Sequence, residues 1–145
     1  MKYIGPDFCN ITTLLSDEEL LIQKTANEFV DKEFMPIVNE YYEKGSFPTE
    51  LIPKMGELGF FGATLPKKYG GSEISSTAYG LIMQELEKGD SGLRSVCSVQ
   101  GGLVMYPIFE YGTEEQKEKW LPQLAQGSAV GCFGLTESNH GSDPG

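Results

Sequence analysis

Residues 93–109 read LRSVCSVQGGLVMYPIF, and this stretch decides the fold. Arg94 is the one charged residue in it, and the others are apolar, glycine or small polar residues. A helix without a charged face is normally covered on all sides by other elements. We therefore predict a helix at the centre of a bundle, with Pro107 limiting its length. Gly101 and Gly102 would allow another helix or a ligand to approach it closely.

Amphipathic segments with clear start signals lie on both sides of this central helix. Ser16 and Glu19, and likewise Thr113 and Gln116, have the spacing of a capping box, in which two side chains satisfy backbone N–H groups at a helix start. Apolar residues at helical spacing follow each start. We predict helices over 17–34 with an extension to about 44, over 49–58 with Thr49 as the cap, over 76–88, and from 114 onward with a kink or early end at Pro122.

The segment after Gly127 differs from the helices before it. Residues 129–135, AVGCFGL, have the length and apolar character of a β-strand, and the chain contains no second strand of this quality. A lone strand cannot satisfy its own backbone groups. We therefore predict an all-α helical bundle of five to six helices, ending in one unpaired β-strand and a loop. The expected divisions are an irregular arm over 1–15, the bundle over 16–128 and the strand with its loop over 129–145, as the front part of a larger protein.

Composition excludes several classes of protein. The net charge of -10 over 145 residues argues against nucleic-acid binding, which needs a basic surface. No apolar run is long enough to span a membrane, and residues 1–10 lack the features of a signal or transit peptide. His140 is the only histidine, so we expect no metal site, and Cys9, Cys97 and Cys132 are predicted to be reduced packing thiols. A cytoplasmic, bacterial protein is the simplest interpretation.

Arg94 is the most informative single residue before the last loop. It is the only arginine in the chain, and a guanidinium on a covered helix is costly unless an anion faces it. One interpretation is an internal ion pair with Glu85, Glu87 or Asp90. The other is an anionic group of a substrate, because a planar guanidinium pairs best with a carboxylate or a phosphate. Composition and spacing leave both open.

The last loop, residues 134–145, is rich in glycine, hydroxyl and amide groups. Small residues let backbone N–H groups approach a ligand closely, so we expect a loop that closes on one. It matches neither the dinucleotide fingerprint nor the phosphate loop, and no strand–helix–strand unit precedes it. Thr136 and Ser142 also lack a histidine and aspartate partner set, which argues against a serine hydrolase.

Four segments together resemble the acyl-CoA dehydrogenase family. Residues 133–143, FGLTESNHGSD, resemble the signature with which the middle β-domain of that family begins. Three further segments resemble the family's N-terminal α-domain, namely residues 65–71 (LPKKYGG), 85–92 (ELEKGDSG) and 111–122 (YGTEEQKEKWLP). Within the family, residues 93–100 and 103–108 are most similar to glutaryl-CoA dehydrogenases.

The resemblance implies roles for two residues of the central helix. In glutaryl-CoA dehydrogenases the residues that match Arg94 and Ser95 bind the far carboxylate of the acyl group. The resemblance therefore favours a substrate anion as the partner of Arg94. It also implies that the catalytic carboxylate base lies in a C-terminal domain absent from these 145 residues, so that the chain alone is expected to be inactive.

For the last loop the resemblance implies contact with FAD and with the substrate. Phe133, Leu135, Thr136 and Ser142 would contact the flavin, and Ser142 would also lie where acyl-CoA meets it. Ser138 stands where the family signature has proline, so this turn lacks the fixed backbone angle that proline supplies.

The implied reaction is α,β-dehydrogenation of an acyl-CoA, followed by loss of the far carboxylate to give crotonyl-CoA from glutaryl-CoA. Electrons would pass to an electron-transferring flavoprotein. The full-length protein would be a homo-oligomer, namely a homotetramer. Two alternatives stay open. One is a dehydrogenase of another dicarboxylic or aromatic acyl-CoA, and the other is an inert helical assembly module.

Overall fold

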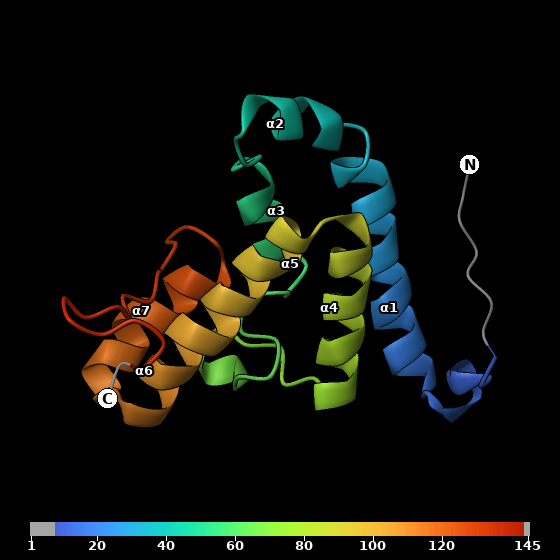
Figure 1. Cartoon of the computed structure of the whole chain (residues 1–145). Coiled ribbons are helices and arrows are strands. Elements are labelled where there is room, and N and C mark those ends of the chain that lie inside the picture. Colours follow the sequence, from blue (N-terminus) through green and yellow to red (C-terminus); the bar gives the residue numbers. More distant parts are fainter. Residues whose placement is uncertain (1–7, 144–145) are drawn as a thin grey trace.

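The computed structural model describes residues 8–143, which fold into one bundle of helices (Figure 1). The predicted all-α class is confirmed. The longer helices are α1 Asp17–Phe29, α2 Val38–Lys44, α3 Leu51–Glu57, α4 Ser76–Gly89, α5 Ser91–Ser98, α6 Tyr106–Tyr111 and α7 Glu114–Ala125. Further helical segments of 3-10 or π type are η1 Ile11–Leu14, η2 Val30–Phe34, η3 Lys67–Tyr69 and η4 Val99–Met105.

The central helix is built from three consecutive segments, α5, η4 and α6, which run from Ser91 to Tyr111 without a break. The Asp90 carboxylate starts it by accepting hydrogen bonds from the backbone N–H groups of Gly92 and Leu93, at 2.7 and 3.3 Å. The middle segment η4 is π-helical. Pro107 follows directly and does not end the helix as expected, because the helix continues through it to Tyr111.

The helix that we expected to be covered on all sides is covered on one. Leu93, Cys97 and Met105 are fully buried, whereas Leu103 and Tyr106 are 47% and 51% exposed. The side that these two residues share is therefore open to solvent. It is this side that an additional domain or a ligand can reach.

The central helix packs directly against α4, which in turn packs against α1. Helices α1 and α4 lie side by side, and α4 leads directly into α5 (Figure 1). Phe29 of α1 packs edge-on against Phe60, with ring centroids 5.6 Å apart. Further large side chains that are fully buried include Met55, Phe61, Ile82, Leu86, Leu93, Met105 and Leu121.

One carboxylate lies inside the α1–α4 contact. Glu85 is 6% exposed and accepts hydrogen bonds from the Gln23 amide at 3.1 Å, the Asn27 amide at 2.9 Å and the Lys88 ammonium at 2.9 Å. A buried carboxylate is tolerated when donors surround it, so Glu85 ties the two helices together. It is therefore not a partner of Arg94.

The start of α1 confirms the first predicted capping box. The Ser16 backbone N–H donates to the Glu19 carboxylate at 3.0 Å, and the Glu19 N–H donates to the Ser16 hydroxyl at 3.3 Å. The Ser75 hydroxyl, at the start of α4, donates to the other Glu19 oxygen at 2.9 Å. These bonds favour the ionised form and lower the pKa of Glu19, the backbone bond from Ser16 contributing most.

This cap predicts a pH dependence of stability. A carboxyl whose pKa is lower in the folded than in the unfolded chain stabilises the fold above its unfolded pKa of 4.5, and that contribution disappears as the pH falls further. We expect thermal midpoints of wild type and Glu19→Gln to differ by a constant amount near neutral pH. The gap should shrink below about pH 4.5. A gap that stays constant down to about pH 3 would contradict the role of the ionised cap.

Three local predictions differ from the structure. Helix α3 begins after Glu50, without a side-chain cap from Thr49. Helix α7 continues through Pro122 to Ala125, although its predicted capping box at Thr113 and Gln116 is confirmed. Of the three cysteines Cys97 alone is buried, where burial raises the pKa of its thiol to about 12.

The strand predicted over 129–135 is not formed. Residues 129–136 have no regular secondary structure, and one isolated bridge joins Glu137 to His140. An extended segment becomes a strand only when a neighbouring strand accepts and donates its hydrogen bonds, and none is present within residues 8–143. Residues 1–7 of the predicted arm and residues 144–145 of the predicted loop lie outside the described residues.

Candidate functional site

Arg94 lies on α5 with its guanidinium partly open to solvent. Its Nε donates to the Glu87 carboxylate at 2.6 Å, and its Nη1 donates to the Ser98 hydroxyl at 3.3 Å. The arginine side chain is 36% exposed and the glutamate 48%. Of the three acidic partners that the sequence offered, Glu87 is therefore the one that pairs, because Glu85 is buried between helices and Asp90 caps α5.

The pairing with Glu87 leaves part of the guanidinium available. A guanidinium carries five N–H donors, and the bonds to Glu87 and Ser98 use two of them. Ser95, the other predicted substrate residue, is half-buried one position further along α5. Its backbone carbonyl accepts the Ser98 hydroxyl at 3.2 Å. The helix thus presents one cation and two hydroxyl groups within a single turn.

Tyr79 of α4 lies within range of the positive charge of Arg94, and no signal in the sequence identified this tyrosine. Burial raises the pKa of Tyr79, and the nearby positive charge of Arg94 opposes that rise in pKa. The phenol is therefore neutral near pH 7 and able to donate a hydrogen bond. A Cβ atom added at Gly101 would lie 3.7 Å from the Tyr79 hydroxyl oxygen, so the glycine leaves room beside it.

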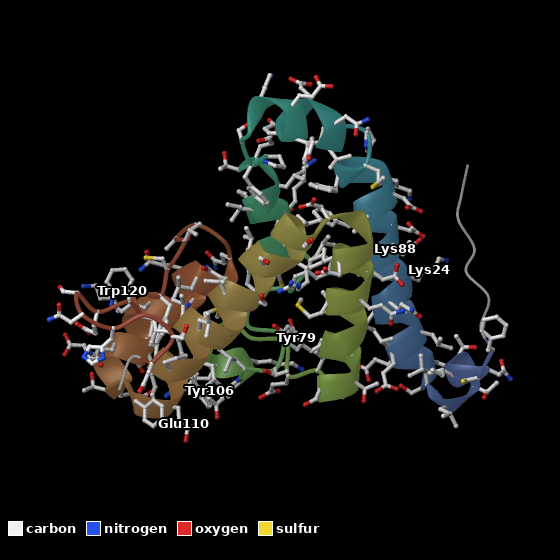
Figure 2. The ribbon with its side chains drawn as sticks, in the orientation of Figure 1. Lys24, Tyr79, Lys88, Tyr106, Glu110 and Trp120 are labelled. Carbon is white, nitrogen blue, oxygen red and sulfur yellow. The ribbon has the colours of Figure 1, made fainter. Side chains whose placement is uncertain are left out.

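A cavity of about 180 Å³ opens next to Tyr79. Tyr79 and Tyr106, labelled in Figure 2, line it together with Gly101 and Gly102 of the central helix and the turn over 62–65. The two glycines that we expected to allow close approach are thus the floor of a pocket. Arg94 supplies a positive charge near the tyrosine, and the pocket supplies a largely apolar wall.

The predicted flavin residues lie in the last segment and are open to solvent. Phe133 and Leu135 are 50% and 53% exposed, and Thr136 and Ser142 are exposed as well. The backbone N–H of His140 donates to the Glu137 carbonyl at 3.2 Å, which folds the loop back on itself. Exposed apolar side chains beside hydroxyl groups are chemically suited to one wall of a site for a planar, partly polar ring such as a flavin.

The structure links this segment to the central helix through Gln100, which the sequence analysis also passed over. The Gln100 amide bonds to the backbone at Ala129 and Gly131, just before Phe133. A buried glutamine in an otherwise apolar helix is the signal that could have identified it. The two predicted groups of site residues, around Arg94 and around Phe133, thus lie on elements that one side chain connects.

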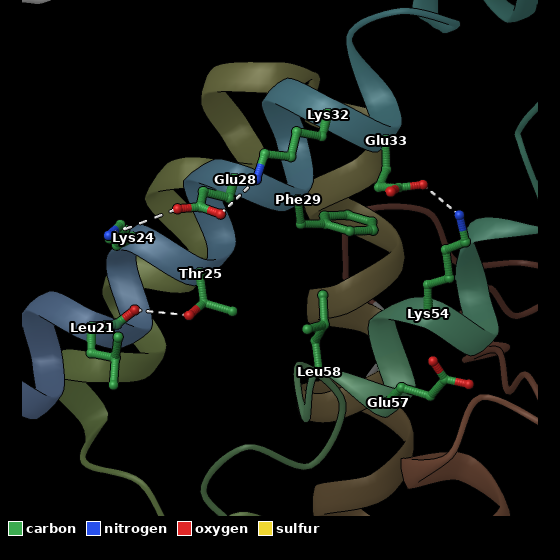
Figure 3. Close-up of a pocket in the computed structure, with 10 residues that line it drawn as sticks. All are labelled: Leu21, Lys24, Thr25, Glu28, Phe29, Lys32, Glu33, Lys54, Glu57 and Leu58. Carbon is green, nitrogen blue, oxygen red and sulfur yellow. Dashed lines mark hydrogen bonds and ion pairs between the residues drawn. The ribbon is translucent and has the colours of Figure 1, made fainter.

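A larger cavity, of about 530 Å³, lies between α1 and α3 and contains none of the predicted site residues (Figure 3). Its rim is charged but internally paired. Lys24 and Lys32 approach Glu28 at 3.9 and 2.8 Å, and Lys54 pairs with Glu33 across the cavity. Glu57 lines the same cavity, so three lysines face three glutamates and the rim presents no excess charge of either sign for a ligand.

Within residues 8–143, no helix is both long and apolar enough to cross a lipid bilayer.

Comparison with known proteins identifies a family. Residues 16–128 match the model of the acyl-CoA dehydrogenase N-terminal domain. A crystal structure of a glutaryl-CoA dehydrogenase from Mycobacterium smegmatis superposes with a TM-score of 0.88 at 49% identity, over 92% of this chain and 35% of that one. A glutaryl-CoA dehydrogenase from the same organism, in complex with FADH2, superposes with a TM-score of 0.89 at 47% identity, over 93% of this chain and 35% of that one.

Two relatives of known sequence are also similar to this chain. A probable acyl-CoA dehydrogenase of Bacillus subtilis is 40% identical over 133 residues, which is 90% of this chain and 34% of that protein. A 3-(aryl)acrylate reductase of Clostridium sporogenes is 37% identical over 130 residues, again 90% of this chain and 34% of that protein. The chain therefore spans about a third of the length of these relatives.

Proposed function

The chain belongs to the acyl-CoA dehydrogenase family, and we propose that it forms the N-terminal α-domain of an FAD-dependent enzyme that oxidises and decarboxylates glutaryl-CoA. Residues 16–128 would be the α-domain in this proposal. Residues 129–145 would begin the middle β-domain, where residues 129–135 become a strand once neighbouring strands are present. The catalytic base would come from a further domain.

The single observation that carries the choice of substrate is the half-exposed guanidinium of Arg94. Its positive charge acts on Tyr79, which lines the apolar pocket, and three of its five N–H donors are not used by Glu87 and Ser98. A glutaryl chain with its far end at Arg94 would bring a carboxylate to those donors, and Ser95 would add a hydroxyl. Glu87 would hold the guanidinium in orientation. A monocarboxylic acyl group would bring no charge to this end.

The last loop would hold the cofactor. Phe133 and Leu135 would pack against the flavin, the Thr136 hydroxyl would hydrogen-bond its edge, and Ser142 would lie between cofactor and acyl-CoA. When bound, FAD supplies the acceptor for the hydride that leaves the β-carbon. The residues of this chain would orient the acyl group so that its α- and β-carbons face that acceptor, and the aromatic side chain would exclude water from it.

The proposed partners follow from this reaction. An electron-transferring flavoprotein would reoxidise the cofactor, and the full-length enzyme would assemble as a homo-oligomer. The open side of the central helix around Leu103 and Tyr106 supports contact with further parts of such an enzyme, because apolar side chains at this exposure favour burial.

An aromatic acyl-CoA is the second candidate substrate. The similarity to a 3-(aryl)acrylate reductase favours it, and the pocket between Tyr79 and Tyr106 has aromatic walls suited to stacking. The cation at Arg94 argues for the dicarboxylic substrate, since an unsubstituted aromatic ring offers it no anion.

The test is anaerobic titration of the full-length enzyme that contains this chain. We expect glutaryl-CoA to bleach the visible flavin band and to release carbon dioxide, with butyryl-CoA and an aryl-propionyl-CoA as comparison substrates. Bleaching by the aryl substrate alone would favour the second candidate. A protein that purifies without flavin and does not take it up would refute both, and would leave an inert helical module.

A further inference from the structure

Gln100 is buried, and its two amide N–H donors and its amide oxygen all form hydrogen bonds. It is 1% exposed, within the π-helical segment η4. Its Nε2 donates to the carbonyl oxygens of Leu124 at 2.9 Å and Ala129 at 2.8 Å, and its Oε1 accepts from the backbone N–H of Gly131 at 3.0 Å. Both N–H donors and the acceptor oxygen of the amide are thus used. A single side chain joins the central helix, the end of α7 and the segment that leads to Phe133.

A second contact holds the same segment against the same helix. A Cβ atom added at Gly131 would approach Val104 Cγ1 to 2.4 Å, which is closer than carbon atoms pack. The backbone at Gly131 therefore lies directly on Val104, four residues along the helix from Gln100. Gly101, the residue after Gln100, lines the pocket beside Tyr79. One stretch of helix thus borders the pocket and also carries the last segment.

We propose that Gln100 is a positioning residue, which fixes residues 129–131 and, through them, the loop from Phe133 onward against the helix that carries Arg94. These residues have no strand partner within the described part of the chain, so their peptide groups depend on such bonds. The assignment of the loop to flavin rests on the proposed function. The fixing of residues 129–131 is a property of this chain alone and is tested without cofactor.

The test is amide hydrogen exchange of the isotopically labelled 145-residue chain, monitored by NMR. Gln100→Met keeps the length of the side chain and removes both donors and the acceptor. We expect the Gly131 amide to exchange about ten-fold faster, because its N–H loses its acceptor. Amides in α1 and α4 should keep their protection. Gln126→Met, an exposed glutamine at the end of α7, is the control and should change neither.

Gln100→Glu provides a rescue. At about pH 5 a glutamic acid side chain that faces two carbonyls is expected to be protonated, so that it accepts from Gly131 and donates to one carbonyl. Protection of the Gly131 amide should then return most of the way towards wild type, whereas Gln100→Met shows no return at the same pH. Gly131→Ala places a methyl group against Val104 and leaves the Gln100 side chain intact. In this variant the Ala129 amide should exchange faster than in wild type.

Two results would overturn the proposal. One is a Gly131 amide that exchanges in Gln100→Met as it does in wild type. The other is an equal loss of protection in α1 and α4, which would make Gln100 a general stabiliser. If Gln100→Met does not fold, Gln100→Leu, which also lacks both donors and the acceptor, carries the test by the same comparison of local and distant amides. Failure here leaves the flavin titration unaffected, and failure of that titration leaves the exchange result standing.

Discussion

Arg94→Gln in the full-length enzyme is expected to lower kcat/KM for glutaryl-CoA by about 100-fold, while kcat/KM for butyryl-CoA changes by less than about three-fold. Loss of one partner of a charge-assisted pair costs about 3 kcal/mol, which corresponds to that factor. The neutral amide cannot offer the remaining guanidinium donors to the far carboxylate. Butyryl-CoA has no charge at that end, so it should not sense the change. The measurement is steady-state turnover of both substrates.

Two further variants separate the possible causes. Arg94→Lys keeps the charge and loses the planar fork, so its loss on glutaryl-CoA should lie between wild type and Arg94→Gln. Lys24→Gln removes a cation from α1 that is 72% exposed and far along the chain from the pocket, and it should leave both substrates unchanged. An equal loss on glutaryl-CoA and butyryl-CoA in Arg94→Gln would refute the carboxylate-binding role. The pair with Glu87 would then be structural.

Phe60→Ala is expected to lower the free energy of unfolding by about 3–5 kcal/mol. The Phe60 side chain is 1% exposed and packs edge-on against Phe29. The Cys97 thiol donates to the Phe60 carbonyl at 3.3 Å, so Phe60 is held between α1 and the central helix. Truncation leaves a cavity that helices on two sides cannot close. Because a domain of this size has a total stability of about 5–15 kcal/mol, a large part of it would be lost.

Urea unfolding, followed by circular dichroism, measures this change. Phe8→Ala is the matched control, because Phe8 is 92% exposed and its truncation should change stability by less than about 0.5 kcal/mol. Phe60→Leu keeps most of the buried volume and should cost less than Phe60→Ala. Equal stability of Phe60→Ala and Phe8→Ala would show that Phe60 lies outside the cooperative core.

Local signals in the sequence predicted most of the helices correctly. Both capping boxes are present where Ser16 and Thr113 indicated them, because a cap depends on residues three positions apart. The central helix was found from its lack of charge. Its open side at Leu103 and Tyr106 was not foreseen, since the same apolar pattern serves a helix covered by its own chain and one that other parts must cover.

The predictions for the site fared unevenly for a similar reason. The sequence identified Arg94 as a cation in need of an anion and offered three acidic neighbours, but it could not rank them. The structure shows Glu87 as the partner, because the fold places Glu85 between α1 and α4. The roles of Ser95, Phe133 and Ser142 stay predictions, as they concern molecules that lie outside this chain.

The sequence by itself determined the helical class, the capped starts of α1 and α7 and the membership of the family, because these depend on short-range spacing and on motifs read along the chain. Only the tertiary structure decided which partner Arg94 holds, that its charge acts on Tyr79 and that Gln100 bonds to residues 129–131. Gln100 and Gly131 are 31 positions apart, and their bond exists only because α7 returns the chain to the central helix. Such contacts join residues far apart in the sequence and depend on how the helices pack, so no local sequence pattern predicts them.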